Sequence, residues 1–95
     1  MYTSIRKYKV HSAAEFTRLV NEGFVPIISS APGFIAYYGV DSGDGVWSSM
    51  SIFETKEEAD ESNHMAADFV REHLKPFIES GPEITIGDLV VDSTR

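Results

Sequence analysis

The chain opens with a strand pattern that is followed by a helix pattern. Residues 2–10 (YTSIRKYKV) are rich in β-branched and aromatic side chains, which predicts a β-strand. From residue 13 onward the apolar positions recur at helical spacing, so that one face carries Ala13, Phe16, Val20, Phe24 and Ile27. Ser12 and Glu15 have the spacing of a capping box, and we therefore expect this helix to begin near residue 13. Pro26 is expected to bend its last turns.

The middle of the chain predicts a β-hairpin. Residues 34–41 (FIAYYGVD) and 46–54 (VWSSMSIFE) flank the turn SGDG, whose glycines and aspartate suit positive φ angles. A two-residue or four-residue loop would pair Val40 with Trp47 and Tyr38 with Ser49. One face of the hairpin would then carry Phe34, Ala36, Tyr38, Val40, Trp47, Ser49, Ser51 and Phe53, and the other would carry Ile35, Tyr37, Val46, Ser48, Met50 and Ile52.

A second helix and a last strand complete the predicted fold. Thr55 and Glu58 form another capping-box pair, which predicts a helix that runs to about residue 78 and is shortened by Pro76. The SGP stretch ends that helix, and residues 83–92 predict a strand with Gly87 as a bulge. The order β-α-β-β-α-β over residues 1–95 predicts one α+β domain with a ferredoxin-like fold, in which two helices cover a four-stranded antiparallel sheet.

Both faces of the predicted hairpin are too apolar to lie in water. Two helices cover only one face of a sheet, and an uncovered apolar face of this size is rare in monomers. We therefore expect a homodimer in which two sheets face each other. The small residues Ala36, Ser49 and Ser51 favour the Trp47 face as the side under the helices. They either leave a cavity there or simply allow a helix to pack closely.

The second helix places polar side chains among its apolar residues. On a helical wheel Ser62, Asn63 and His73 fall within the apolar stripe, whereas His64 falls on the opposite side. Buried polar groups need partners, so Asn63 and His73 are either bonded inside the core or are polar points of a small-molecule pocket. Such a pocket would be lined by Phe16, Tyr38, Trp47, Ser49 and Phe53.

Composition removes several classes of function. The net charge of −7 disfavours nucleic acids and anionic membranes as partners. The absence of cysteine excludes thiolate chemistry, and histidines at positions 11, 64 and 73 lack the spacing of a metal site, so no metal is expected. No leader-like apolar segment and no stretch of about 20 apolar residues is present, which predicts a cytoplasmic protein.

The stretch APGFIAYYGVD, followed by VWSSMSIFETKEEADESNHMAADF, resembles the antibiotic biosynthesis monooxygenase-like family of dimeric α+β barrels. The clearest elements are the Pro-Gly-Phe that precedes the second strand and the Phe-Glu that precedes an acidic, capped helix. Many members of the family carry tryptophan where this chain has Phe53, so the match is one of fold more than of activity.

The resemblance implies a homodimer that oxidises an aromatic or enolic substrate with O2 and without metal or flavin. It implies that Asn63, Tyr38 and Trp47 hold the substrate as an anion and that His73 is the catalytic base, with Asn63 and His73 the two catalytic residues. The alternative is a non-catalytic ligand-binding or stress-related dimeric module that uses the same fold.

Overall fold

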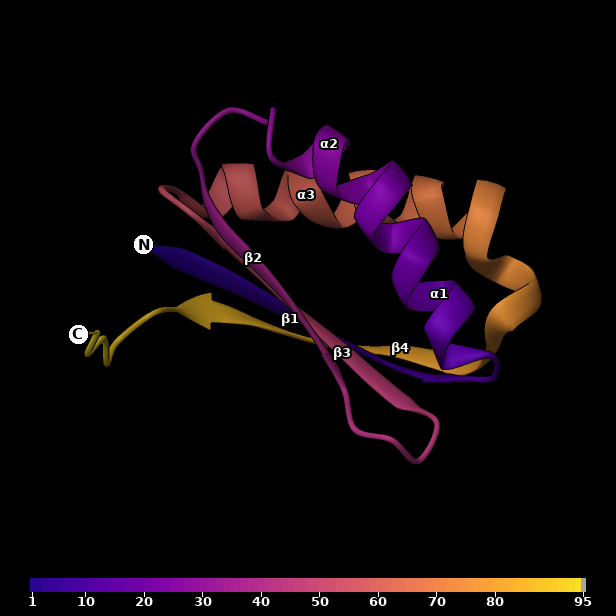
Figure 1. The fold of residues 1–95 in the computed structure, drawn as a ribbon. Helices are drawn as coiled ribbons and strands as arrows, with labels where there is room; N and C mark the ends of the chain where they lie inside the picture. Colours follow the sequence, from indigo (N-terminus) through magenta and orange to yellow (C-terminus); the bar gives the residue numbers. More distant parts are fainter. Residues whose placement is uncertain (95) are drawn as a thin grey trace.

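Residues 1–94 are described by a computed structural model, in which a layer of helices covers one side of a four-stranded antiparallel sheet (Figure 1). The predicted α+β, ferredoxin-like fold is confirmed. The elements in chain order are β1 (Tyr2–Val10), α1 (Ala13–Leu19), the π-helical turn η1 (Val20–Phe24), α2 (Val25–Ile28), β2 (Phe34–Asp41), β3 (Val46–Phe53), α3 (Lys56–Phe69), the π-helical turn η2 (Val70–Leu74), the 3-10 turn η3 (Lys75–Phe77) and β4 (Ile78–Asp88).

The sheet has the strand order β2-β3-β1-β4, so β1 lies in its interior and β2 and β4 form its edges. In β1 the residues Ser4, Arg6 and Tyr8 pair with Ser51, Ser49 and Trp47 of β3, respectively. Paired residues point to the same side of a sheet. Because the Trp47 side lies beneath the helices, Arg6 is carried into the interior layer together with Tyr8.

The predicted face of β3 is confirmed, but the predicted pairing of the hairpin is wrong by one residue. Trp47 pairs with Asp41 and not with Val40, so five residues lie between these two partners, and the Ser42 N–H donates to the Val46 carbonyl. This spacing is one residue longer than the four-residue loop that was expected. A bulge between Phe34 and Ala36 allows Phe34 to pair with Phe53, although the rest of β2 is shifted by one residue.

The shifted pairing exchanges the two tyrosines of β2. Tyr37 lies under the helices, and Tyr38 lies on the uncovered side, where it is 58% exposed. Gly39 faces the Trp47 indole so closely that a Cβ there would lie 2.8 Å from the ring, so only glycine leaves room for it. The prediction that Tyr38 faces the interior is therefore wrong.

The chain has two continuous helical segments, α1–η1–α2 and α3–η2–η3, called the first and the second helix below. Each contains a π-helical turn, which changes the direction in which later residues point. A π turn spaces bonded residues by five instead of four and so rotates the following side chains relative to an ideal wheel. In the first helix Ile28 is buried in place of the predicted Ile27. In the second helix an ideal wheel puts His73 and Leu74 on the same side, but only Leu74, five residues after Phe69, is buried.

The helix ends agree with the sequence at one of the two predicted capping boxes. Thr55 and Glu58 form the complete reciprocal pair at the start of α3, whereas Ser12 has φ 55° and its side chain caps nothing. The second helical segment ends at Phe77, and β4 begins immediately afterwards. The SGP stretch therefore lies inside β4, and Gly87, predicted as a bulge, pairs regularly with Thr3.

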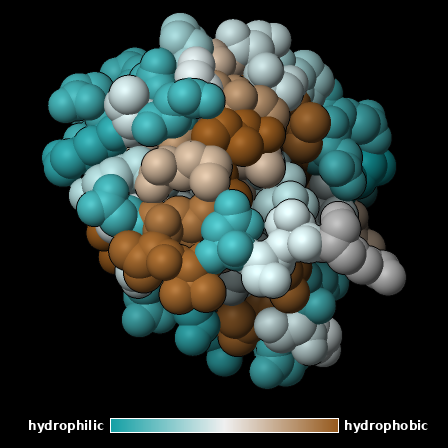
Figure 2. Space-filling model, turned by 90° about the vertical axis from the view of Figure 1, so that its left-hand side faces the viewer, coloured by the Kyte–Doolittle hydropathy of each residue, from teal (hydrophilic) through white to brown (hydrophobic). Residues whose placement is uncertain are grey.

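The uncovered side of the sheet, called the open face below, is lined with apolar residues. By the observed register it carries Ile5, Ala36, Tyr38, Val40, Met50 and Ile52. Figure 2, viewed from the side of the chain termini, shows apolar residues in brown from the upper centre down to the lower part of that view. Within residues 1–94, no helix has the length and apolar character to cross a membrane. The cytoplasmic location stays a prediction.

Candidate functional site

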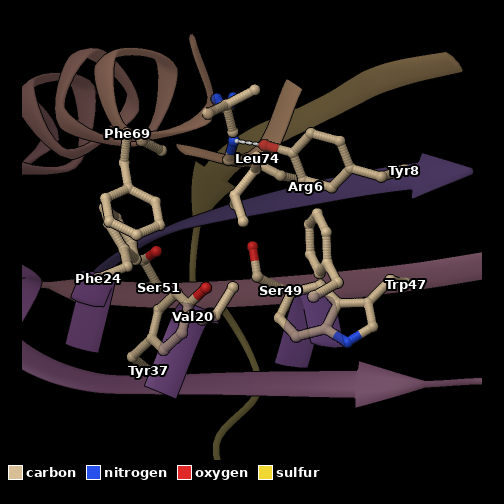
Figure 3. Close-up of a pocket in the computed structure, with 13 residues that line it drawn as sticks. Arg6, Tyr8, Val20, Phe24, Tyr37, Trp47, Ser49, Ser51, Phe69 and Leu74 are labelled. Atoms are coloured by element: carbon tan, nitrogen blue, oxygen red, sulfur yellow. Dashed lines mark hydrogen bonds between the residues drawn. The ribbon is translucent and has the colours of Figure 1, made fainter. Parts of the chain in front are cut away.

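The middle of the space between helices and sheet is almost completely filled, whereas a groove of about 460 Å³ lies toward β2, lined among others by Thr17, Tyr37 and Trp47. An inner cavity of about 20 Å³ remains, lined among others by Arg6, Tyr8, Phe16, Tyr37, Trp47 and Ser49 (Figure 3). This volume suits about one water molecule. The serine hydroxyls and the Tyr37 hydroxyl turn toward the middle of the view, which gives an otherwise aromatic layer a few polar points.

Three of the predicted pocket residues line this cavity. Phe16 is 1% exposed and meets the Trp47 ring edge-on at a centroid distance of 4.9 Å. Ser49 lies two residues after Trp47 on β3, and the side chains of Phe16, Trp47 and Ser49 all belong to the cavity wall. The indole N–H of Trp47 donates to Thr17 Oγ1 at 2.9 Å, so its one donor is already used within the chain.

Arg6 is the most unusual group of the site. It is 5% exposed, its Nε donates to the Tyr8 hydroxyl at 2.9 Å, and its Nη1 donates to Asn63 Oδ1 at 3.1 Å. Within residues 1–94 no carboxylate forms an ion pair with it. A buried charge without a counter-charge is costly, because burial removes its water and hydrogen bonds to neutral groups replace only part of the lost interaction.

Asn63 is bonded to the sheet, which is one of the two alternatives that the sequence left open. Its Oδ1 accepts from Arg6 and also from Ser4 Oγ at 2.8 Å. It does not line the inner cavity but an open groove between α3–η2 and β4, called the α3–β4 groove below, which includes Arg6, Lys75, Gly81 and Ile84. Arg6 borders both spaces.

The remaining predicted site residues lie elsewhere. His73 is exposed, its ring lies tilted against Phe69 at a centroid distance of 4.7 Å, and it lies near Glu72. Its predicted place in the pocket is therefore wrong, because of the π turn in η2. Tyr38 is on the open face because of the shifted hairpin pairing. Phe53 is fully buried but packs against Phe34 at 5.9 Å, outside the wall of the cavity.

Burial shifts the acid–base behaviour of the two tyrosines of the cavity. Burial raises the pKa of Tyr37 from 10.0 to about 12, partly offset by a hydrogen bond with Ser49. Burial also raises the pKa of Tyr8, and the neighbouring Arg6 charge and hydrogen bond oppose that shift. Both phenols therefore keep their protons at neutral pH and act there as neutral polar groups.

Tyr37 is expected to make folding less favourable at high pH. The unfolded chain ionises this phenol near pH 10, while the folded chain holds the proton to about pH 12. The stabilisation is present below pH 10 and is lost as pH rises toward 12. Melting temperatures measured across this range should fall more steeply for the wild-type chain than for Tyr37→Phe. Equal slopes for the two would contradict the assignment.

Metal chemistry finds no support among residues 1–94, where no group of three or more His, Asp or Glu side chains converges on one point. The arrangement instead offers a cation, a neutral phenol and hydroxyls around an aromatic space. Such a set can bind an organic anion by charge and hydrogen bonding.

Arg6 is a functional candidate that the predicted pocket omits, although the sequence carries a signal for it. Residues 2–10 alternate, so Lys7 and Lys9 point to one side and Arg6 shares the other side with Tyr8 and Val10. An arginine on the apolar side of an interior strand is uncommon and is a candidate functional group. Tyr37 had no comparable signal, because its side depends on the loop length of the hairpin.

The strand order and the helix layer define a ferredoxin-like α+β fold, which a putative antibiotic biosynthesis monooxygenase from Nitrosomonas europaea shares with a TM-score of 0.74 at 17% identity, covering 95% of this chain and 100% of that chain. No protein-family model matches the sequence, and no curated protein matches it significantly. A protein of unknown function from Nitrosomonas europaea has a TM-score of 0.81 at 12% identity, covering 99% of this chain and 93% of that chain.

Two similar structures are oxygenases. The monooxygenase ActVA-Orf6 of Streptomyces coelicolor, in complex with the ligand nanaomycin D, has a TM-score of 0.76 at 17% identity and covers 99% of this chain and 91% of that one. SnoaB, a cofactor-independent oxygenase from Streptomyces nogalater, has a TM-score of 0.74 at 14% identity and covers 96% and 94%. These structures match the predicted resemblance, and at such identities they establish the fold alone.

Proposed function

We propose that this chain binds a small aromatic or enolic acid beside Arg6 and promotes its oxidation by O2 without a metal or flavin. The observation that carries the proposal is the buried Arg6 guanidinium, which has no carboxylate partner among residues 1–94. An anionic ligand would supply the missing counter-charge. The same attraction lowers the pKa of a bound phenol or enol, so more of it is present as the anion.

The proposed reaction needs only the substrate and O2. The substrate loses a proton to give an enolate, which transfers one electron to O2 and becomes a radical beside superoxide. The two radicals combine, a C–O bond forms, and the peroxide takes up the proton. Loss of water from the hydroperoxide then leaves a new carbonyl group, so one O2 yields one carbonyl oxygen and one water. Arg6 stabilises the anion, and no residue is assigned as the base.

The small inner cavity limits how such a substrate can bind. An aromatic ring does not fit into about 20 Å³, so binding in the inner cavity itself requires the lining rings to move apart. The α3–β4 groove offers a second approach, because Arg6 also borders it. The similarity in fold to oxygenases supports the reaction class and says nothing of the substrate.

The second candidate function is binding without catalysis. It is supported by the small size of the inner cavity and by the internal bonds of the Trp47 N–H and the Asn63 carbonyl, which leave those groups unavailable to a substrate. A native mass spectrum of the purified protein would detect a ligand that remains bound under either function. Only oxygen consumption separates the two.

Oxidation is tested with anthrone, an enolisable aromatic ketone that O2 converts into the corresponding quinone and water. We expect wild-type protein to accelerate oxygen uptake and Arg6→Met to lower kcat/KM about tenfold or more, as for a lost charged hydrogen bond. Arg6→Lys keeps the charge and should retain more activity than Arg6→Met. Binding of anthrone with no added oxygen uptake would support the second candidate, and equal rates for both variants would remove Arg6 from the mechanism.

We further propose that the chain forms a homodimer through its open face. The apolar residues of that face support this arrangement, since Val40 and Tyr38 are both more than half exposed in the single chain. A two-fold contact would place each open face against its copy and remove both from water.

A further inference from the structure

The α3–β4 groove is large enough for a small organic molecule. Its volume is about 570 Å³, within the range of about 300–1,000 Å³ that ligand pockets usually have. One wall is the face of α3 and η2 that includes Asn63 and Val70, and the other is the first half of β4 from Ile78 to Ile84. Arg6 reaches the groove from β1, the interior strand beside β4.

The groove carries an excess of positive charge on an acidic chain. Its lining includes Arg6, Arg71 and Lys75, together with His64, against one carboxylate, Glu79. Within residues 1–94, Arg71 is paired with Asp68 at 2.7 Å and Glu79 lies 3.5 Å from His11. No carboxylate of this range pairs with Arg6 or Lys75, so both charges are available to a ligand.

The amide of Asn63 is held in one orientation by its neighbours. Arginine can only donate hydrogen bonds, so the atom that faces Arg6 must be the amide oxygen, and that oxygen also accepts from Ser4. The amide nitrogen therefore points elsewhere and has no partner among residues 1–94. Because Asn63 lines the groove, its N–H groups are donors for a ligand there.

Apolar side chains form the rest of the two walls. Ala67 and Val70 come from the helical side, and Ile78 and Ile84 come from β4. Ile84 is 49% exposed although it lies on the helix side of the sheet, because the helices do not extend over this edge strand. A ligand with an apolar body would bury this surface while its acidic end meets the cations.

We propose that the α3–β4 groove is a binding site for a small organic carboxylate with an apolar body, whose carboxylate is held by Arg6, Lys75 and the amide nitrogen of Asn63. This site goes beyond the proposed oxidation, since it requires neither O2 nor an enolisable ligand. Arginine and amide donors match the two oxygens of a carboxylate, and Lys75 adds charge at the open side.

The test uses benzoate as the carboxylate probe and benzamide as its neutral counterpart. Both are titrated into the isotope-labelled full chain, and amide shifts are followed by NMR. We expect saturable benzoate shifts at Ala67, Lys75 and Gly81, with binding that weakens as salt is added. Benzamide should bind at least about tenfold more weakly, because it loses the charged hydrogen bond to the buried Arg6 as well as the attraction of Lys75.

Two lysine variants separate the site from general charge effects. Lys75→Gln should weaken benzoate binding about fivefold, and Asn63→Leu should weaken it as well. Lys56→Gln is the matched control, because Lys56 lies at the far start of α3, outside the groove and paired with Asp60, and this variant should bind benzoate like the wild type. The NMR spectrum of each variant reports whether it is folded.

Three results would overturn the proposal. They are an absence of saturable shifts in the wild type, equal affinity for benzoate and benzamide, and equal weakening by Lys75→Gln and Lys56→Gln. Benzoate cannot undergo the proposed oxidation, so binding here is independent of that reaction. Binding of benzoate without oxidation of anthrone would support this inference and refute the proposed oxygenase activity. Oxidation of anthrone without binding of benzoate would refute this inference and support the oxygenase activity.

Discussion

Phe16→Ala is expected to lower the free energy of unfolding by about 3–5 kcal/mol, the range typical of a fully buried aromatic side chain. Phe16 is 1% exposed and contacts both Tyr8 and Trp47, so its removal leaves a void in the middle of the layer. A domain of this size has a total stability of about 5–15 kcal/mol. The loss would therefore be a large share of the whole.

Urea denaturation measures this loss, with Ile27→Ala as the matched control on the same helical segment. Ile27 is 46% exposed, and its truncation should cost less than about 1 kcal/mol. The Phe16→Ala void should also bind benzene, which ought to raise the melting temperature of the variant more than that of the wild type. A loss below about 1 kcal/mol would show that the layer is looser than its contacts indicate.

Met50→Glu is expected to separate the proposed dimer into monomers. Met50 pairs with Ile5 on one side and with Tyr38 on the other, which places it in the middle of the open face. In a two-fold contact the substitution buries two unpaired carboxylates, each of which costs several kcal/mol. The dissociation constant should rise about a hundredfold or more.

Light scattering across a dilution series measures the mass of each variant. Ala14→Glu adds the same charge on an exposed position of α1 and should leave the dimer intact. A dimer that survives Met50→Glu would move the interface away from the open face. A wild-type chain that is monomeric at every concentration would refute the dimer itself.

The sequence predicted the kinds of element and their order because long periodic segments dominate this chain. Trp47, Ser49 and Phe16 were placed correctly for the same reason, since β3 alternates regularly and Phe16 precedes the first π turn. The misplaced residues follow irregularities of one residue. Tyr38 was misplaced by the extra loop residue, and His73 was misplaced by the π turn at Val70–Leu74.

Neither irregularity has a local sequence signal strong enough to be read in advance. A five-residue loop and a four-residue loop both suit SGDG, and a π turn differs from an α turn mainly in how later side chains pack. The β4 boundary failed for another reason. Gly81 and Pro82 are typical of a turn outside a strand. The pairing of β1 with β4 nevertheless continues past them, with register shifts between Lys7 and Lys9 and between Lys9 and Val10.

The guanidinium of Arg6 lies between the enclosed inner cavity and the open α3–β4 groove. Arg6 carries one positive charge, so an anion in the inner cavity and an anion in the α3–β4 groove compete for the same counter-charge, even though the two anions do not touch. By thermodynamic linkage each would weaken the other to the same extent. An organic anion bound in the α3–β4 groove would therefore weaken the binding of an anion in the inner cavity, with no movement of the backbone required.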